Sequence, residues 1–97
     1  MSEIDTIMTV IEARADEIRS SFGVSRLGVF GSRARGDALQ ESDLDVLVEF
    51  ESPTFRNYMG LKRFLEEISG MSVDLVSIAA VRPALRPYIM SEIRYVA

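Results

Sequence analysis

Apolar residues along this chain follow helical spacing near the start and strand-like spacing after residue 26. The helical repeat, with an apolar residue every three or four positions, comprises Ile4, Ile7, Met8, Ile11, Ala15, Ile18 and Phe22. It predicts one amphipathic helix that runs to about Ser20 and is closed by Gly23. The short apolar run Leu27–Phe30 then predicts a buried first strand.

The middle of the chain predicts a second strand followed by a long helix. Apolar and other residues alternate from Asp43 to Phe50, as in a strand with one buried face. The predicted buried face consists of Leu44, Val46, Val48 and Phe50. Ser52 and Pro53 are typical of a helix N-cap and first turn, and Gly70 is placed to end that helix. Its predicted inward face consists of Phe55, Tyr58, Leu61, Phe64, Leu65 and Ile68.

The last third predicts a third strand at Val73–Ile78 and then a closing helix. The helix is indicated by the four-residue spacing of Leu85, Ile89 and Ile93. Between the first two strands, Gly31–Glu41 is polar and predicts a loop with at most one helical turn. The order helix, strand, helical turn, strand, helix, strand, helix predicts an α/β or α+β fold with helices layered on a small sheet. We expect residues 1–97 to form one domain.

Composition excludes several classes of function. Eleven Lys and Arg against fifteen Asp and Glu give a net charge of −4, which provides no large positive field to attract a nucleic-acid backbone. The chain contains no Cys and no His, so any metal ion must be bound by oxygen ligands. No apolar run approaches the roughly 20 residues of a membrane span, and the start lacks the features of a secretory leader. The cytoplasm is the expected location.

Three Asp residues form the candidate metal-binding set. Asp43 and Asp45 are two positions apart on the second predicted strand, so their carboxylates leave the same face. Asp74 interrupts the apolar third strand. If the third strand pairs beside the second, the three carboxylates converge. Such a cluster repels itself unless cations lie between its members, and Mg²⁺ prefers oxygen ligands of this kind.

Gly31 and Ser32 form the candidate phosphate-binding corner directly after the first strand. A glycine lets the backbone turn tightly and approach a ligand closely, and the backbone N–H groups and the Ser32 hydroxyl are suited to bind phosphate oxygens. Arg35 supplies positive charge nearby. A P-loop is excluded because Asp37 and Ala38 stand where that motif needs Lys and Ser or Thr.

The spacing of Gly31-Ser32, ten residues and then Asp43-Leu44-Asp45 resembles the signature of the DNA polymerase β-type nucleotidyltransferase superfamily. The local match is closest to its minimal members, because the runs Gly31–Gly36, Ser42–Asp45 and Val73–Val76 follow in the same order. The resemblance implies the nucleotidyltransferase fold, a small mixed sheet with helices mainly on one face. It also implies ATP as substrate and two Mg²⁺ ions. The implied roles make Asp43, Asp45 and Asp74 the metal ligands, with Asp74 also the candidate base, and Gly31, Ser32 and Arg35 the nucleotide-binding residues.

The resemblance also implies a biological role. Minimal nucleotidyltransferases are typically the antitoxin partners of helical HEPN toxins, and some transfer AMP to a tyrosine of the toxin. Two alternatives stay open: an antitoxin that only occludes its toxin, and a subunit that modifies a small molecule. Leu47, Val76 and Ile78 are expected on the carboxylate face, where the tail and either a partner or a second copy of the chain would cover them. The role of Arg33 is left open.

Overall fold

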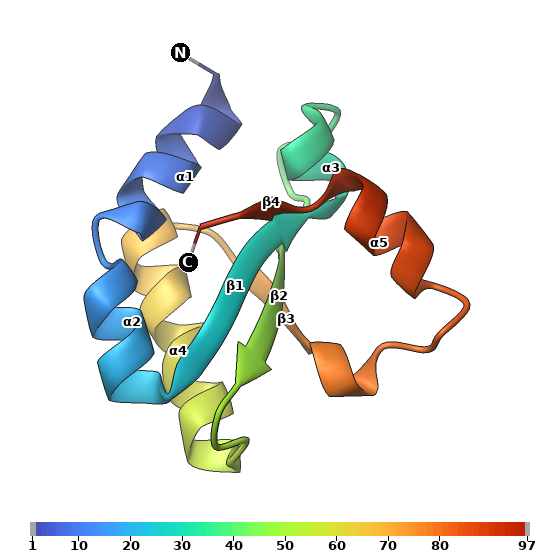
Figure 1. The fold of residues 1–97 in the computed structure, drawn as a ribbon. Coiled ribbons are helices and arrows are strands. Elements are labelled where there is room, and N and C mark those ends of the chain that lie inside the picture. Colours follow the sequence, from blue (N-terminus) through green and yellow to red (C-terminus); the bar gives the residue numbers. More distant parts are fainter. Residues whose placement is uncertain (1, 97) are drawn as a thin grey trace.

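Helices cover one face of a four-stranded sheet in the computed structural model, which describes residues 2–96 (Figure 1). The elements are α1 (Glu3–Glu12), α2 (Ala15–Phe22), β1 (Val24–Phe30), α3 (Gly31–Arg35), β2 (Leu44–Phe50), α4 (Phe55–Ser69), β3 (Val73–Ser77), the 3-10 turn η1 (Ile78–Ala80), α5 (Arg86–Glu92) and β4 (Arg94–Tyr95). Figure 1 shows α1, α2 and α4 together on one side, and α3 and α5 near one end of the sheet. No helix within residues 2–96 is long and apolar enough to cross a membrane.

The sheet is mixed, as the resemblance implied. Its strand order is β3-β2-β1-β4, with β1 antiparallel to both β2 and β4 and β2 parallel to β3. The parallel pair is connected through α4, which crosses over the face that it covers. Its register sets Leu44 opposite Val73 and Asp45 opposite Asp74. The fold class predicted from the sequence is therefore confirmed.

The hydrophobic core lies between this sheet and α1, α2 and α4. Leu44, Val46 and Val48 of β2 are fully buried, which confirms the face assigned to them. Leu61 and Leu65 of α4 are also fully buried and belong to the same cluster. The sheet face that carries these residues is thus covered by helices, and the opposite face carries Asp45 and Leu47 of β2 and Asp74 and Val76 of β3.

The prediction of a single first helix is wrong, because this part of the chain forms two helices, α1 and α2, with a break between them. Arg14 leaves the helical conformation at φ −111° and ψ 14°, and its N–H donates to the Ile11 carbonyl at 3.0 Å. The break lets α1 contact α3 and α2 contact β1 while both contact α4. Since Ile11 and Ile18 are buried on either side of it, the apolar spacing continues across the break and gives no sign of it.

The predicted start of the long helix is also wrong. The N-cap of α4 is Thr54, whose side chain accepts a hydrogen bond from the Asn57 N–H at 3.1 Å, and not Ser52. Phe55 was expected to point inward but is 81% exposed, because as the first residue of α4 it lies where the helix begins, beyond the buried positions. Gly70 ends the helix in the left-handed conformation at φ 71°, as predicted.

Several strand ends differ from those predicted, and one strand was missed. β1 begins at Val24, and β3 gives way to η1 at Ile78. The strand β4 pairs with Gly28 and Val29 of β1. A Cβ on Gly28 would lie 2.7 Å from the Ile93 side chain, so the glycine allows the tail to approach β1 closely. Two residues are too few to show the alternation by which strands are recognised.

Candidate active site

The β2–β3 pair brings two of the candidate carboxylates side by side. Asp45 and Asp74 are register partners in neighbouring parallel strands, and their side chains leave the sheet on the face opposite the buried Leu44 and Val46. Asp43 lies just before β2 and is exposed. The structure therefore confirms that the third predicted strand pairs beside the second, on which the convergence of the three acids depended.

The electrostatics of this corner favour a bound cation. Partial burial raises the pKa of Asp45, and the negative charges of Asp74 and Asp43 raise it further, while the positive charge of Arg35 acts in the opposite direction. All the candidate ligands are carboxylate oxygens, the donors that Mg²⁺ prefers. Within residues 2–96, no three acidic side chains already surround one ion-sized position. The three carboxylates are chemically suited to bind Mg²⁺. Without a cation, repulsion between their negative charges keeps them from converging on one point.

Gly31 lies directly against Asp45. Its φ is +77°, a left-handed conformation that side chains with a Cβ rarely adopt, and a Cβ built on it would be 2.0 Å from the Asp45 Oδ2 atom. Ser32 follows as the second residue of α3 and is half-buried. The turn after β1 thus brings Gly31 to the Asp45 carboxylate, with Ser32 next to it in the chain.

A carboxylate from the tail joins this corner and was not predicted. Glu92, the last residue of α5, accepts a hydrogen bond from the Gly31 N–H at 3.0 Å with Oε1. Its Oε2 atom lies 2.9 Å from Nη1 of Arg35, which is also paired with Asp37 at 3.2 Å. The hydrogen bond to Glu92, and after it the one to Asp37, raises the pKa of Arg35 above its usual value. No sequence motif marks Glu92, because only the return of the tail to α3 brings it here.

Comparison with known proteins decides the family. The protein-family model for the nucleotidyltransferase domain matches residues 11–96 of the chain. This chain belongs to the nucleotidyltransferase family. It is 36% identical to the protein adenylyltransferase MntA of Thermococcus cleftensis, over 99% of this chain and 98% of the relative. As a family member, the chain is an enzyme that transfers a nucleotidyl group.

Solved structures agree with this assignment. A candidate minimal nucleotidyltransferase of known structure is 36% identical and aligns with a TM-score of 0.74, covering 97% of this chain and 95% of that chain. A tri-AMPylated Shewanella oneidensis HEPN toxin in complex with its MNT antitoxin provides a second match, with a TM-score of 0.65 and 15% identity, covering 93% of this chain and 71% of that chain. At that identity, the second match shows the shared fold alone.

Arg33 of the nucleotidyltransferase has a structural role that the sequence left open. Its side chain is only 6% exposed, and Nη1 lies 2.6 Å from the Glu3 carboxylate. Nε and Nη2 donate to the Ser42 carbonyl at 3.0 and 2.7 Å, and Nη2 also donates to the Gln40 carbonyl at 3.1 Å. Arg33 therefore ties α3 to the loop that ends at Asp43.

Replacing Arg33 by Ala is expected to lower the free energy of unfolding by about 3 kcal/mol, because two partly buried hydrogen-bonded carbonyls and one carboxylate lose their donor. Thermal or urea unfolding measures this loss. The matched control is Arg19→Ala, which removes an exposed ion pair with Asp16 and should change stability little. Equal stability of the two variants would show that Arg33 does not hold the loop.

The enzyme also has a cavity beside the carboxylates. Its volume is about 380 Å³, and its walls are formed by Phe30, Asp45, Asp74, Val76, Ala80, Val81, Arg82, Leu85 and Ile89. The volume is within the range of small-molecule sites. The segment from η1 to α5 forms one wall and covers part of the carboxylate face. One side of the cavity is therefore acidic, and most of the remainder is apolar.

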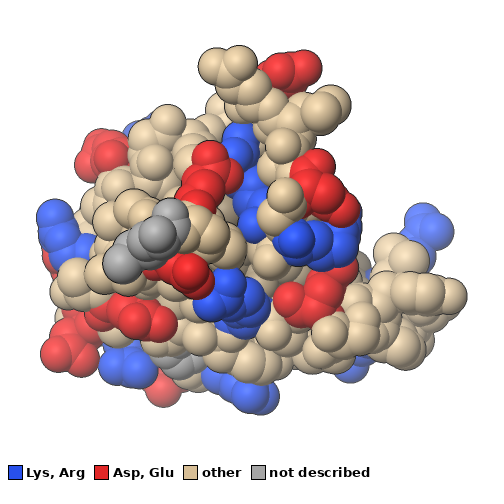
Figure 2. All heavy atoms as spheres, turned by 90° about the horizontal axis from the view of Figure 1, so that it is seen from above, with Lys and Arg blue, Asp and Glu red and all other residues tan. Residues whose placement is uncertain are grey.

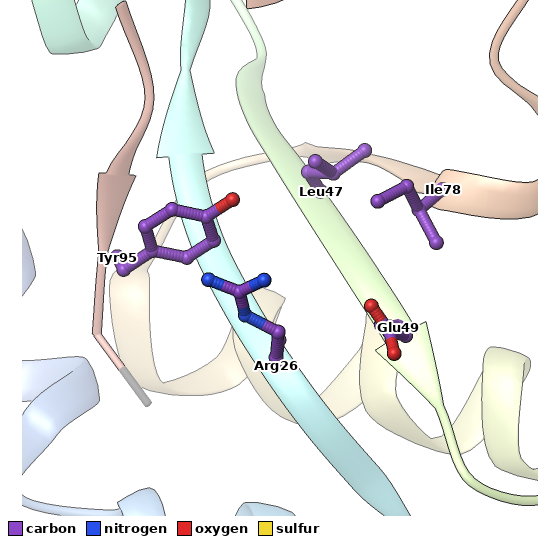
Figure 3. Close-up of a pocket in the computed structure, with 5 residues that line it drawn as sticks. All are labelled: Arg26, Leu47, Glu49, Ile78 and Tyr95. Atoms are coloured by element: carbon purple, nitrogen blue, oxygen red, sulfur yellow. The ribbon is translucent and has the colours of Figure 1, made fainter. Parts of the chain in front are cut away.

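A second hollow on the same face is too small for a ligand. It is lined by Arg26, Leu47, Glu49, Ile78 and Tyr95, and its volume is about 10 Å³, room for one water molecule. Figure 3 shows the Arg26 guanidinium beside the Tyr95 ring, 4.5 Å from the ring centre. Leu47 was expected on the carboxylate face, where something must cover it. It is only 4% exposed, so the chain itself already covers this side chain.

Charges around the end that carries α3 and α5 are mixed in sign. Figure 2, which views the molecule from above Figure 1, shows basic and acidic side chains interspersed on this face, without a broad basic patch. The lobe at the right of that view carries mostly uncharged residues. This face therefore presents no continuous positive field.

Proposed function

We propose that this nucleotidyltransferase transfers AMP from ATP to a tyrosine hydroxyl of a HEPN toxin partner in the cytoplasm, and so acts as its antitoxin. The observation that carries the proposal is the position of Asp45 opposite Asp74 across the β2–β3 pair, directly against Gly31. The protein adenylyltransferase among its relatives and the AMPylated toxin complex among its fold neighbours support the nucleotide and the partner.

In this proposal the nucleotide is held from two sides. Gly31 and Ser32 bind triphosphate oxygens through backbone N–H groups and the serine hydroxyl, and Arg35 offsets part of the phosphate charge. Asp43, Asp45 and Asp74 hold two Mg²⁺ ions. When bound, these ions neutralise charge on the phosphates and on the attacking and leaving oxygens.

The chain's own groups then carry the transfer. The cavity beside Asp74 gives an aromatic acceptor side chain a place next to that carboxylate. Asp74 accepts the proton of the acceptor hydroxyl while the oxygen forms a bond to the α-phosphorus. The bond between the α-phosphorus and the bridging oxygen to the β-phosphate breaks, and pyrophosphate leaves. The turn at Gly31 positions the triphosphate for this displacement.

The test incubates the purified chain with ATP, Mg²⁺ and its HEPN partner and measures the mass of the partner. We expect the partner to gain one or more AMP groups with the wild-type chain and with Asp16→Asn, a change of an exposed carboxylate on α2. We expect no gain with Asp43→Asn. An unmodified partner that is nevertheless neutralised would favour an occluding antitoxin, and transfer only to a small molecule would favour the third role.

A further inference from the structure

The carboxylate of Glu92 binds two groups that the proposed function assigns to phosphate binding, the Gly31 N–H and the Arg35 guanidinium. One of its oxygens accepts the Gly31 N–H at 3.0 Å, and the other lies 2.9 Å from the Arg35 guanidinium. A carboxylate and a phosphate use the same kinds of donor, backbone N–H groups and guanidinium groups. The tail of the chain thus presents an anion at the position where the nucleotide would present one.

We propose that Glu92 is a built-in competitor of the nucleotide, which must displace this carboxylate from Gly31 and Arg35 before its phosphates bind. The inference rests on the proposed function and adds to it a means by which the C-terminal segment controls access to the same site. Nothing in the sequence motifs assigns Glu92 to the site.

Glu92 and a nucleotide phosphate cannot both accept the same hydrogen bond, which supports competition between them rather than simultaneous binding. Gly31 has one backbone N–H, and in the structure that hydrogen is already donated to Glu92. Arg35 also contacts Asp37, so the guanidinium already faces two carboxylates. A triphosphate placed here would meet the Glu92 carboxylate in addition to Asp43, Asp45 and Asp74, and like charges at short range oppose its approach.

The segment that carries Glu92 is held lightly enough to move. α5 has seven residues, and none of them is buried. β4 adds two residues that pair with β1, and Arg94 forms an exposed ion pair with Asp5 at 3.2 Å. Segments with few buried contacts open at low free-energy cost. Displacement of the Glu92 carboxylate therefore does not require the core to open.

The experiment measures the affinity of the full chain for a non-hydrolysable ATP analogue with Mg²⁺ by calorimetry. We expect Glu92→Ala to bind the analogue roughly five- to thirtyfold more tightly than the wild type, because one charge-assisted contact no longer competes. Glu92→Gln keeps the side-chain shape, removes the charge and should bind more tightly by a smaller factor. Glu67→Gln, on an exposed position of α4, is the matched control and should bind like the wild type.

The possible outcomes separate this inference from the proposed function. Binding by the wild type with equal or weaker binding by both Glu92 variants would overturn the competitor role and leave the proposed function standing. Absence of binding by all four proteins would overturn both. Thermal unfolding of each variant shows whether it is folded, and the Gln variant decides the question if the Ala variant is not.

Discussion

Replacing Asp45 by Asn is expected to reduce nucleotidyl transfer roughly a thousandfold or more, because the variant lacks the carboxylate at the centre of the proposed metal-binding set. The fold should persist. Burial and the charges of Asp74 and Asp43 raise the pKa of Asp45 above its unfolded value, so the ionised side chain opposes folding at neutral pH. The thermal midpoint of Asp45→Asn without ligands should therefore equal or exceed that of the wild type.

Steady-state transfer and thermal unfolding, measured on the same preparations, test this pair of effects. Asp16→Asn is the control, since it makes the same chemical change at an exposed position of α2. Transfer at the wild-type rate by Asp45→Asn would contradict the role of Asp45. A large fall in its thermal midpoint would show instead that the carboxylate supports the fold.

Replacing Gly31 by Ala is expected to have the second-largest effect. The new methyl group would lie 2.0 Å from Asp45 Oδ2 in the present backbone, at a φ of +77°. Either the turn or the Asp45 carboxylate must move, and we expect transfer to fall at least a hundredfold, as a shift of about 1 Å at a reacting centre can cause. The strained backbone should also lower the free energy of unfolding by roughly 1–3 kcal/mol.

Gly36→Ala separates the two effects of the Gly31 change. Gly36 has a similar φ of +85°, but a Cβ there would meet no atom within 4 Å. Its replacement should cost a similar free energy of unfolding through backbone strain, with transfer close to wild type. If both variants lost transfer equally, the contact between Gly31 and Asp45 would not be the cause. Transfer rates and urea unfolding of both variants provide the comparison.

The sheet and its buried face were predictable from the sequence because their signals are local. The alternation in β2 places Leu44, Val46 and Val48 on one side, and all three are buried there. The acids two positions apart leave the other face for the same reason. The fixed spacing between Gly31 and Asp43 could be read directly, since both belong to one short segment.

What the sequence did not predict depends on tertiary contacts. The break at Arg14 is invisible because apolar spacing continues through it, and the start of α4 at Phe55 was missed because Ser52 and Thr54 are both suitable caps. The contact of Glu92 with Gly31 joins residues 61 positions apart. No local pattern can show such a contact, and only the return of α5 and β4 to β1 produces it.

The central claim is that Asp43, Asp45, Asp74 and the Gly31–Ser32 turn form one metal and nucleotide site. The most direct test is a crystal of the full chain grown with Mn²⁺ and a non-hydrolysable ATP analogue, measured at a wavelength where manganese scatters anomalously. We predict manganese peaks at the three carboxylates and phosphates at the Gly31–Ser32 turn. Manganese or phosphates bound elsewhere, with these carboxylates free, would contradict the account.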